Sequence, residues 1–516
     1  MTTEPIPAQL AAACQAVRPA TGADAVSGVQ PKFVAAPAST QEAAELLRAA
    51  ADLGWAVVPR GSGSKLHWGA PPLRCDLVIE TTRLDQVVEH AAGDLVVTVQ
   101  AGVSLERLAE VLGTAAQRLA LDPPLITPIH PAPPPSTPAP HSIDGPLVSS
   151  GQHQWAIGAA QATRTRGTVG GVLATGVAGP LRLRYGSGRD LLIGITVVRA
   201  DGTIARSGGK VVKNVAGYDL GKLFAGSRGT LGLITEATFR LHPVPAERAY
   251  VTVESAAGIQ ACRLIAMALE SPLAPVAAEL DWPGAGEPVR AGIALEGDTA
   301  GVAERTRLLC GLLAHAAPVV SAEPPPWWGA GPASQQDGSV VQIAFWPGDL
   351  GLILAEIRTA AHAAGVDPAV GGSAAGLLTA SLPPEADAAA VAAFVTGLRA
   401  VLGHGLPGQA GHRLADVPRP MAGAGRHGAG ARAGHARPPS PAAVAGDAQQ
   451  AAGPGQRRAA GGPPARANVV VLHAPAAVGG LIDLFGPVPS LALMRAIKDQ
   501  FDPGRIMSPG RFAGGI

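Results

Sequence analysis

The sequence has almost no net charge and few aromatic side chains. Its 516 residues include 40 Lys and Arg against 39 Asp and Glu, so the formal net charge is +1. Nucleic-acid binding favours a net basic face, and the cancelled charge therefore predicts no nucleic-acid partner. Aromatic residues make up 3% of the chain, whereas 66 Gly and 48 Pro predict many turns. A chain of this length can bury several cores, and we expect two domains.

Grouped metal ligands and long apolar runs are also missing. The four cysteines, Cys14, Cys75, Cys262 and Cys310, form no CxxC or Cys/His cluster, which excludes a sequence-local metal or iron–sulfur site. We expect them to be buried free thiols in a reducing compartment. The first ten residues lack the basic and apolar regions of a signal peptide, and no apolar run reaches the ~18 residues of a membrane span. The sequence therefore predicts a cytoplasmic protein without a membrane span.

Hydrophobic periodicity predicts alternating helices and strands in the first half of the chain. Ser39 to Glu42 forms a capping box before a helix that Gly54 ends, and residues 104 to about 119 show a second amphipathic helix. Asp201-Gly202 is typical of a tight hairpin turn. Strand-like runs cover residues 55–58, 77–80, 95–100, 191–198 and 231–241. This alternation indicates an α/β or α+β fold.

Two stretches break the pattern. Residues 123–146 carry ten prolines and no clear period, which indicates a polyproline-like or disordered excursion. Residues 408–467 are almost entirely Ala, Gly, Pro, Arg, His and Gln, with eight Arg against two Asp. Too few apolar residues are present there to offset the cost of ordering the chain. A disordered loop and a shifted reading frame in GC-rich DNA both explain this composition. We expect the strand from Asn468 and the helix from Leu491 to resume the second domain.

A glycine-rich turn, Pro59 to Lys65, follows the strand at 55–58. Backbone N–H groups that converge in such a turn can bind a diphosphate, and small residues let the phosphates approach closely. Arg60 and Lys65 could offset the phosphate charge, and the sequence does not say which of them faces the ligand. A Gly/Ser turn between strands is also a common structural connection. The turn is neither a Walker loop nor a complete GxGxxG motif.

Two further segments contain more glycine than a simple connection between secondary-structure elements requires. Thr168 to Gly176 contains two adjacent glycines in an apolar run, which indicates close approach by a neighbouring strand or a flat ligand. Thr168 and Thr175 add hydroxyl groups that could donate to a phosphate or a ring carbonyl. Residues 213–224 and 226–235 place charged and polar residues between glycines just before a strand. Packing and ligand binding both remain open for each segment taken alone.

Together these segments resemble the FAD-binding domain shared by vanillyl-alcohol oxidase, p-cresol methylhydroxylase and the FAD-linked 2-hydroxy-acid dehydrogenases. The resemblance covers about residues 28–245 apart from the proline-rich insert. It implies that FAD is the cofactor, that the first turn holds the diphosphate and that the other two segments line the flavin. The residues expected to bind FAD are Arg60, Gly61, Ser62, Gly63, Ser64, Lys65, Thr168, Val169, Gly170, Gly171, Ala174, Thr175, Gly176, Gly229, Thr230, Leu231, Gly232 and Ile234.

Within this family the chain is most similar to the E-type FAD-binding subunit of bacterial glycolate oxidase. The resemblance implies oxidation of glycolate or a related 2-hydroxy acid beside a catalytic flavoprotein subunit and an iron–sulfur subunit. It also implies a cytoplasmic location, peripheral to the inner membrane through these partners. The segments that carry the likeness are 63–72, 121–124, 181–186, 208–219, 498–503 and 509–512.

The linkage of FAD can also be predicted. Several relatives attach FAD covalently through a His just after the glycine turn. Aligned on Arg60, that position is Ser64, which cannot form the bond, and His67 is interpreted as an ordinary polar side chain. The chain is therefore expected to bind FAD non-covalently.

The resemblance predicts an α+β fold with a two-subdomain FAD-binding domain, a smaller α+β cap domain and a C-terminal return segment. The expected divisions are an N-terminal segment 1–27, the FAD-binding domain 28–245 with the insert at about 125–162, the cap domain 246–407, the low-complexity segment 408–467, and 468–516 as the C-terminal part of the cap domain and closing segment.

Two functions remain open from the sequence. In the first, FAD accepts a hydride equivalent from the α-carbon of a 2-hydroxy acid. In the second, the chain binds FAD as a structural or electron-relay subunit with no substrate chemistry of its own. The residues of the second domain are too scattered to name a general base or any other catalytic residue.

Overall fold

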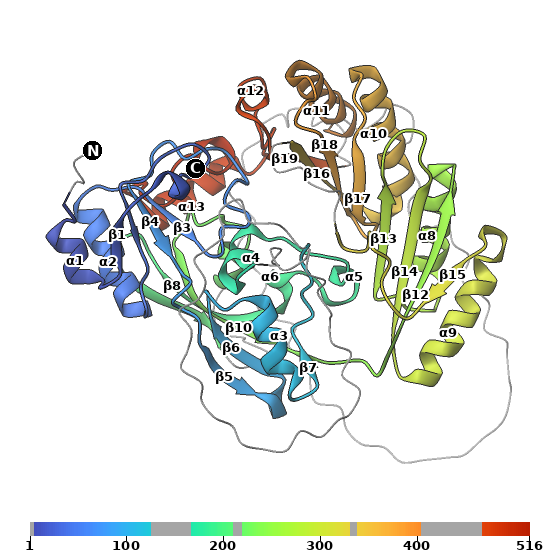
Figure 1. The fold of residues 1–516 in the computed structure, drawn as a ribbon, viewed down its shortest axis with the longest axis horizontal. Coiled ribbons are helices and arrows are strands. Elements are labelled where there is room, and N and C mark those ends of the chain that lie inside the picture. Colours follow the sequence, from blue (N-terminus) through green and yellow to red (C-terminus); the bar gives the residue numbers. More distant parts are fainter. Residues whose placement is uncertain (1–4, 125–166, 210–218, 331–337, 404–466) are drawn as a thin grey trace, which may run out of the picture.

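The computed structural model describes residues 5–124, 167–209, 219–330, 338–403 and 467–516. Strands within these ranges form a four-stranded, a five-stranded, a two-stranded and an eight-stranded sheet (Figure 1). The α+β class predicted from the sequence is confirmed. The expected insert at 125–162 and nearly all of the low-complexity segment lie outside the described residues.

The first sheet has the order β1-β2-β4-β3, and β2, β4 and β3 run parallel. Helix α2 begins at the predicted cap, where Ser39 Oγ accepts the N–H of Glu42 at 3.1 Å. Its leucines pack with α1 against the strands, because they recur on one face of the helix. The elements are α1 (Ala8–Ala13), β1 (Val17–Pro19), β2 (Phe33–Ala35), α2 (Thr40–Asp52), β3 (Val57–Arg60) and β4 (Leu77–Glu80).

The second sheet is antiparallel in the order β5-β6-β10-β8-β9. Asp201-Gly202 forms the predicted turn, with Val198 opposite Ile204. The amphipathic helix predicted over 104–119 is shorter and ends at Gly113, after which β7 pairs with β11. The elements are β5 (Val87–Ala91), β6 (Val96–Gln100), α3 (Leu105–Gly113), β7 (Gln117–Arg118), α4 (Val169–Thr175), α5 (Arg182–Tyr185), α6 (Gly188–Leu191), β8 (Leu192–Val198), β9 (Ile204–Gly208), α7 (Gly221–Phe224), β10 (Leu233–Arg240) and β11 (His242–Pro243).

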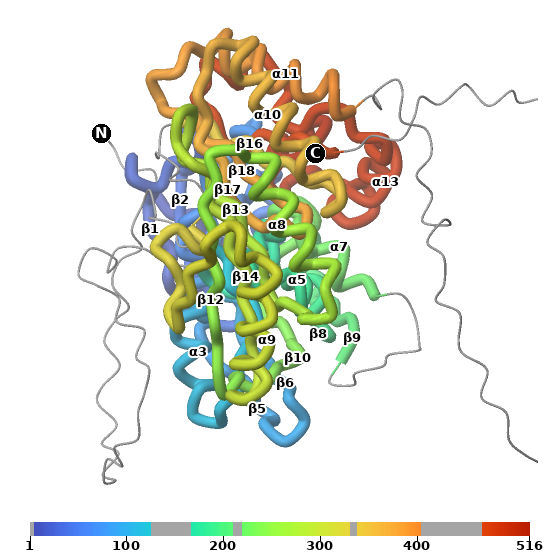
Figure 2. Tube along the Cα trace, turned by 90° about the vertical axis from the view of Figure 1, so that its right-hand side faces the viewer, coloured from blue at the N-terminus to red at the C-terminus, as the bar shows by residue number. Residues whose placement is uncertain are grey.

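The third large sheet consists of two βαββαβ units joined through β13 and β17. Helices α8 to α11 cover one face, and their apolar residues form its core. Figure 2 looks from the side of this sheet, which lies in front of the smaller sheets. The elements are β12 (Glu247–Ser255), α8 (Gly258–Glu270), β13 (Ala277–Trp282), β14 (Val289–Gly297), α9 (Thr299–Leu312), β15 (Val319–Ser321), β16 (Ser339–Phe345), α10 (Leu350–Ala364), β17 (Ala369–Ser373), β18 (Leu377–Leu382), α11 (Ala388–Gly403) and β19 (Ala467–His473).

The C-terminal segment returns to the first two sheets after α12 (Ala476–Gly479) and α13 (Leu491–Phe501). We expected α13 to pack on the second domain, and it contacts the FAD-side sheets as well. Its N-terminal half contacts the core of the eight-stranded sheet, whereas Phe501 stacks edge-on against Phe224. Lys498 Nζ also donates to Thr230 O at 2.7 Å. Residues 506–508 then run beside Val57 of β3, so the end of the chain closes the first sheet.

Candidate functional site

The glycine turn follows β3 and divides its two basic residues between separate roles. Arg60 is 7% exposed and forms ion pairs with Asp24 at 2.8 Å and Glu80 at 2.7 Å. These contacts connect β3 to β4 and to the segment that carries Asp24, so the guanidinium already has two carboxylate partners. Lys65 is also buried, and burial lowers its pKa to about 8. Of the two predicted cations, Lys65 is therefore the one beside the turn.

The turn and the second glycine segment contact each other. A Cβ atom on Gly61 would collide with Thr168 Oγ1, so only glycine fits this approach. Gly167 has a φ of +101°, and a Cβ there would lie 3.2 Å from Lys65 Nζ and 3.4 Å from Ser64 Oγ. Two of the three predicted segments therefore form one small-residue surface with a buried cation at its edge.

Helix α4 is held by its own hydroxyl groups and by β6. Thr168 Oγ1 accepts the N–H of Gly171 at 3.3 Å, and the N–H of Gly170 donates to Ala101 O at 2.8 Å. Thr175 Oγ1 donates to Gly171 O at 2.7 Å. The hydroxyl hydrogen of Thr175 is therefore used within the helix in this structure, and its contact with FAD stays a prediction. The predicted residues Val169, Ala174 and Gly176 lie along the same helix and its end.

The third predicted segment, residues 226–235, contacts both α4 and the start of the glycine turn. The N–H of Arg228 donates to Ala174 O at 2.7 Å, and a Cβ on Gly229 would lie 3.1 Å from Pro59 Cγ. Thr230 Oγ1 donates to Ser227 O, so this hydroxyl hydrogen is also used internally. Thr230 and Leu231 line a small cavity of about 170 Å³. Gly232 precedes β10, and Ile234 lies in that strand within the core of the second sheet.

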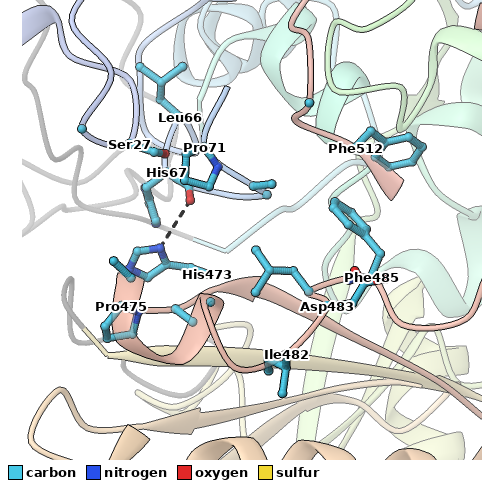
Figure 3. A pocket seen from close by; sticks show the side chains of 18 of the residues that line it. Ser27, Leu66, His67, Pro71, His473, Pro475, Ile482, Asp483, Phe485 and Phe512 are labelled. Carbon is cyan, nitrogen blue, oxygen red and sulfur yellow. Dashed lines mark hydrogen bonds between the residues drawn. The ribbon is translucent and has the colours of Figure 1, made fainter. Parts of the chain in front are cut away.

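A larger cavity of about 880 Å³ lies where the first sheet meets the C-terminal segment. Its wall includes Gly63 of the predicted turn, and the other predicted residues lie outside the lining. His67 and His473 contact each other edge to face in its wall, with ring centroids 4.8 Å apart (Figure 3). Figure 3 also shows Phe485 and Phe512 together at another part of the wall. The cavity is thus built from segments that are distant in sequence.

The cavity wall is bordered by cations. Arg511 is 5% exposed and donates to Trp68 O at 2.8 Å, and burial lowers its pKa to about 10. His67 has a pKa lowered to about 3 by burial and by the neighbouring His473, Arg511 and Lys65. Asp483 is the acidic residue among the described lining residues, and it is exposed. This electrostatic environment favours an anionic ligand.

Residues 31–130 and 146–208 match the family of the FAD binding domain. The cofactor of the chain is FAD, as the sequence predicted.

Curated relatives match the chain over less than half of its length. An uncharacterised FAD-linked oxidoreductase of Mycobacterium tuberculosis is 32% identical over 246 residues, 48% of this chain and 45% of the relative. The glycolate oxidase subunit GlcD of Bacillus subtilis is 32% identical over 42% of this chain and 38% of the relative. The D-lactate dehydrogenase of Archaeoglobus fulgidus is 33% identical over 41% and 38%. The chain therefore spans less than half the length of these relatives.

Solved structures extend the likeness in fold. A p-cresol methylhydroxylase with substrate bound has a TM-score of 0.59 at 12% identity, covering 94% of this chain and 89% of the neighbour. An alkyldihydroxyacetonephosphate synthase has a TM-score of 0.57 at 14% identity, covering 94% and 78%. These neighbours confirm the predicted fold class.

The residues present fit the diphosphate of FAD. Gly61 lets the glycine turn lie directly against the side chain of Thr168 at the start of α4, and Gly63 has a φ of +75°, which favours glycine. Lys65 is buried beside this surface and can offset phosphate charge. The predicted binding set remains a prediction residue by residue, with Arg60 better explained as a support of β3.

Sequence reasoning missed several groups around the larger cavity. His67 was interpreted as an ordinary polar side chain, but it lines the cavity and its buried Nδ1 has no hydrogen-bond partner among the described residues. Arg228 and Arg511 were noted only within motifs. Each follows a small residue in a glycine-containing turn. A charged residue in such a turn was the sequence feature that could have pointed to them. Among the described residues, no group of His, Cys, Asp and Glu could hold a metal ion, and no helix is long and apolar enough to cross a membrane.

Proposed function

We propose that this chain is the FAD-binding subunit of a glycolate oxidase-type complex that oxidises glycolate or a related 2-hydroxy acid to the 2-oxo acid. Its partners would be a catalytic flavoprotein subunit and an iron–sulfur subunit. We further propose a cytoplasmic complex, peripheral to the inner membrane through these partners. The observation that carries the proposal is the shared chemistry of the relatives: a glycolate oxidase subunit, a D-lactate dehydrogenase and a D-2-hydroxyglutarate dehydrogenase.

The cavity supports a small anionic substrate. A 2-hydroxy acid carries one carboxylate, and Arg511 and Lys65 lie buried near the cavity wall. When bound, FAD supplies the acceptor for a hydride from the α-carbon. The hydroxyl proton leaves for a base or solvent, so that the 2-hydroxy acid loses two electrons and two hydrogens. The chain's own residues then have to hold the carboxylate and exclude water from the reacting carbon.

A second candidate function is an FAD-binding structural or electron-relay subunit without substrate chemistry. The pKa of His67 favours it, because an imidazole with a pKa of about 3 is a weak acceptor for a hydroxyl proton. In that case the partner flavoprotein would oxidise the substrate.

An anaerobic titration separates the two functions. The purified full-length chain, loaded with FAD, is mixed with glycolate without oxygen, and its flavin absorbance is followed. Bleaching supports substrate oxidation by this chain. If glycolate bleaches only a complex that contains the partner flavoprotein, the relay function is correct. The iron content of the material that co-purifies with the tagged chain tests the iron–sulfur partner.

A further inference from the structure

Lys498 of α13 uses all three hydrogens of its buried ammonium group. The side chain is 1% exposed, and Nζ donates to Asp502 Oδ2 at 2.6 Å, to Thr230 O at 2.7 Å and to Met507 O at 2.8 Å. An ammonium group has three donors, so this set of acceptors satisfies it completely. Lys498 therefore ties α13 to two segments that lie far apart in the sequence.

Asp502 is the charged acceptor of this network and is itself fully buried. Its Oδ1 accepts the N–H of Ile506 at 3.0 Å, and its Oδ2 accepts the N–H of Met507 at 2.8 Å. A buried ion pair is favourable only when further hydrogen bonds satisfy its remaining atoms, and this pair meets that condition. The network thus holds the backbone from Asp502 to Met507 in one position.

The backbone held in this way lies beside β3 of the first sheet. The N–H of Val57 donates to Ile506 O at 2.7 Å, and the N–H of Ser508 donates to Val57 O at 2.8 Å. Strand β3 leads into the glycine turn that is predicted to hold the diphosphate of FAD. One end of the network is therefore attached to the strand that supplies this turn.

The other end of the network is the third predicted segment, in which the carbonyl group of Thr230 accepts from Lys498. This segment also lies close to the glycine turn and to the C-terminal residues. A Cβ on Gly229 would lie 3.1 Å from Pro59 Cγ and 3.4 Å from Ser508 Oγ. The third segment is therefore enclosed between the glycine turn and the C-terminal segment, and Lys498 joins it to the latter.

We propose that Lys498 is a positioning residue for the flavin. It fixes the carbonyl group of Thr230, and with it the segment that is predicted to line the flavin. FAD binding and the docking of residues 502–508 on β3 are then coupled, because both depend on the same three hydrogen bonds of Lys498. The proposal goes beyond the proposed function, since it holds whether the chain oxidises a substrate or relays electrons.

The test compares FAD with ADP as ligands of the flavin-free full-length protein. ADP carries the adenine and the diphosphate but no flavin, so it probes the glycine turn without the third segment. Lys498→Met removes the three donors, and Asp502→Asn removes the counter-charge of Lys498 while leaving Thr230 intact. Arg505→Gln is the matched control, because Arg505 lies in the same segment and its exposed side chain pairs with Asp499.

Isothermal titration calorimetry measures both affinities. Loss of the charge-assisted hydrogen bond to Thr230 O should weaken FAD binding by Lys498→Met about 10- to 100-fold. ADP binding should change less than about threefold, since the diphosphate surface does not contain Lys498. Asp502→Asn should show the same selective loss to a smaller extent, and Arg505→Gln should bind both ligands like the wild type. Equal weakening of FAD and ADP, which a merely structural Lys498 would cause, or unchanged FAD affinity in Lys498→Met, would overturn the proposal.

Amide hydrogen exchange tests the coupling even if Lys498→Met does not fold. Coupling between two sites is reciprocal, so FAD should slow exchange at residues 506–508 of the wild type more than at β12 and β14, whose buried residues belong to the core of the eight-stranded sheet. In Asp502→Asn, saturated with FAD, this difference should disappear. Equal protection of both regions in the wild type, or a difference that Asp502→Asn retains, would show that the C-terminal segment and the flavin are not coupled through Lys498.

Discussion

Replacing one or the other of the two adjacent glycines of α4 with alanine should have opposite effects on stability. A Cβ on Gly170 would lie 2.7 Å from Ala101 Cβ and 3.1 Å from Ala101 O. An ordinary contact needs at least 3.4 Å, so α4 would have to move from β6 by about 0.7 Å (3.4 minus 2.7). The backbone hydrogen bond from Gly170 to Ala101 O opposes that movement. A Cβ on Gly171 meets only Thr168 Oγ1 at 3.1 Å, a single hydroxyl that can adjust.

The magnitude follows from two opposing terms. Overpacking costs roughly 1–3 kcal/mol, and replacing a helical glycine with alanine recovers roughly 0.8–1 kcal/mol. Gly170→Ala should therefore destabilise the FAD binding domain by up to roughly 2 kcal/mol. For a unit of this size that lowers the melting temperature by up to roughly 8 °C. Gly171→Ala should gain most of the helix term and melt roughly 1–4 °C higher than the wild type.

Differential scanning calorimetry of the flavin-free full-length variants measures both shifts. FAD occupancy of Gly170→Ala should also fall, because moving α4 disturbs the contact between Thr168 and Gly61. Equal shifts of the two variants in the same direction, or a Gly170→Ala variant that melts above the wild type, would refute the packing derived for this helix.

Three further predictions concern buried charges and the flavin linkage. Glu279 of β13 is 3% exposed, its Oε1 has no partner among the described residues, and burial and nearby Asp122 raise its pKa well above 4.5. Since the pKa of Glu279 is raised in the folded state, the stability of the wild type falls as pH rises above about 4.5. Glu279→Gln should therefore melt at a higher temperature than the wild type at neutral pH. If the variant keeps this higher melting temperature in acid, ionisation of Glu279 is not the cause. Arg60→Met should destabilise the first sheet by about 3–5 kcal/mol in urea unfolding, because Asp24 and Glu80 lose their buried partner; a loss under 1 kcal/mol, about that of an exposed pair, would argue against it. Acid precipitation should release all flavin to the supernatant because Ser64 replaces the linking His, and yellow precipitate would show a covalent bond.

Local features could be predicted from the sequence because nearby residues decide them. The cap at Ser39, the Asp201-Gly202 hairpin and the limits of α13 each depend on side chains within a few positions. The fold class and the FAD binding domain followed from three glycine segments whose contacts the structure shows at Gly61 and Thr168.

Contacts between distant segments could not be predicted in this way. The role of Arg60 depends on Asp24 and Glu80, and the end of the helix predicted to reach 119 depends on β7 pairing with β11. The cavity requires contact between His67 and His473, which lie 406 positions apart in the sequence. No periodicity in the sequence encodes such a meeting, since it results from how the sheets close on the C-terminal segment.

The central claim is that FAD binds where the glycine turn meets α4, and its most direct test is the FAD-to-protein ratio of Gly171→Asp purified with excess FAD. A carboxylate at this position would repel the diphosphate or the flavin carbonyl groups, while the space around Gly171 lets the fold persist. We predict a ratio near zero at a melting temperature close to that of flavin-free wild type, and a ratio near one for Gly171→Ala. A Gly171→Asp variant that retains stoichiometric FAD would contradict this placement of the cofactor.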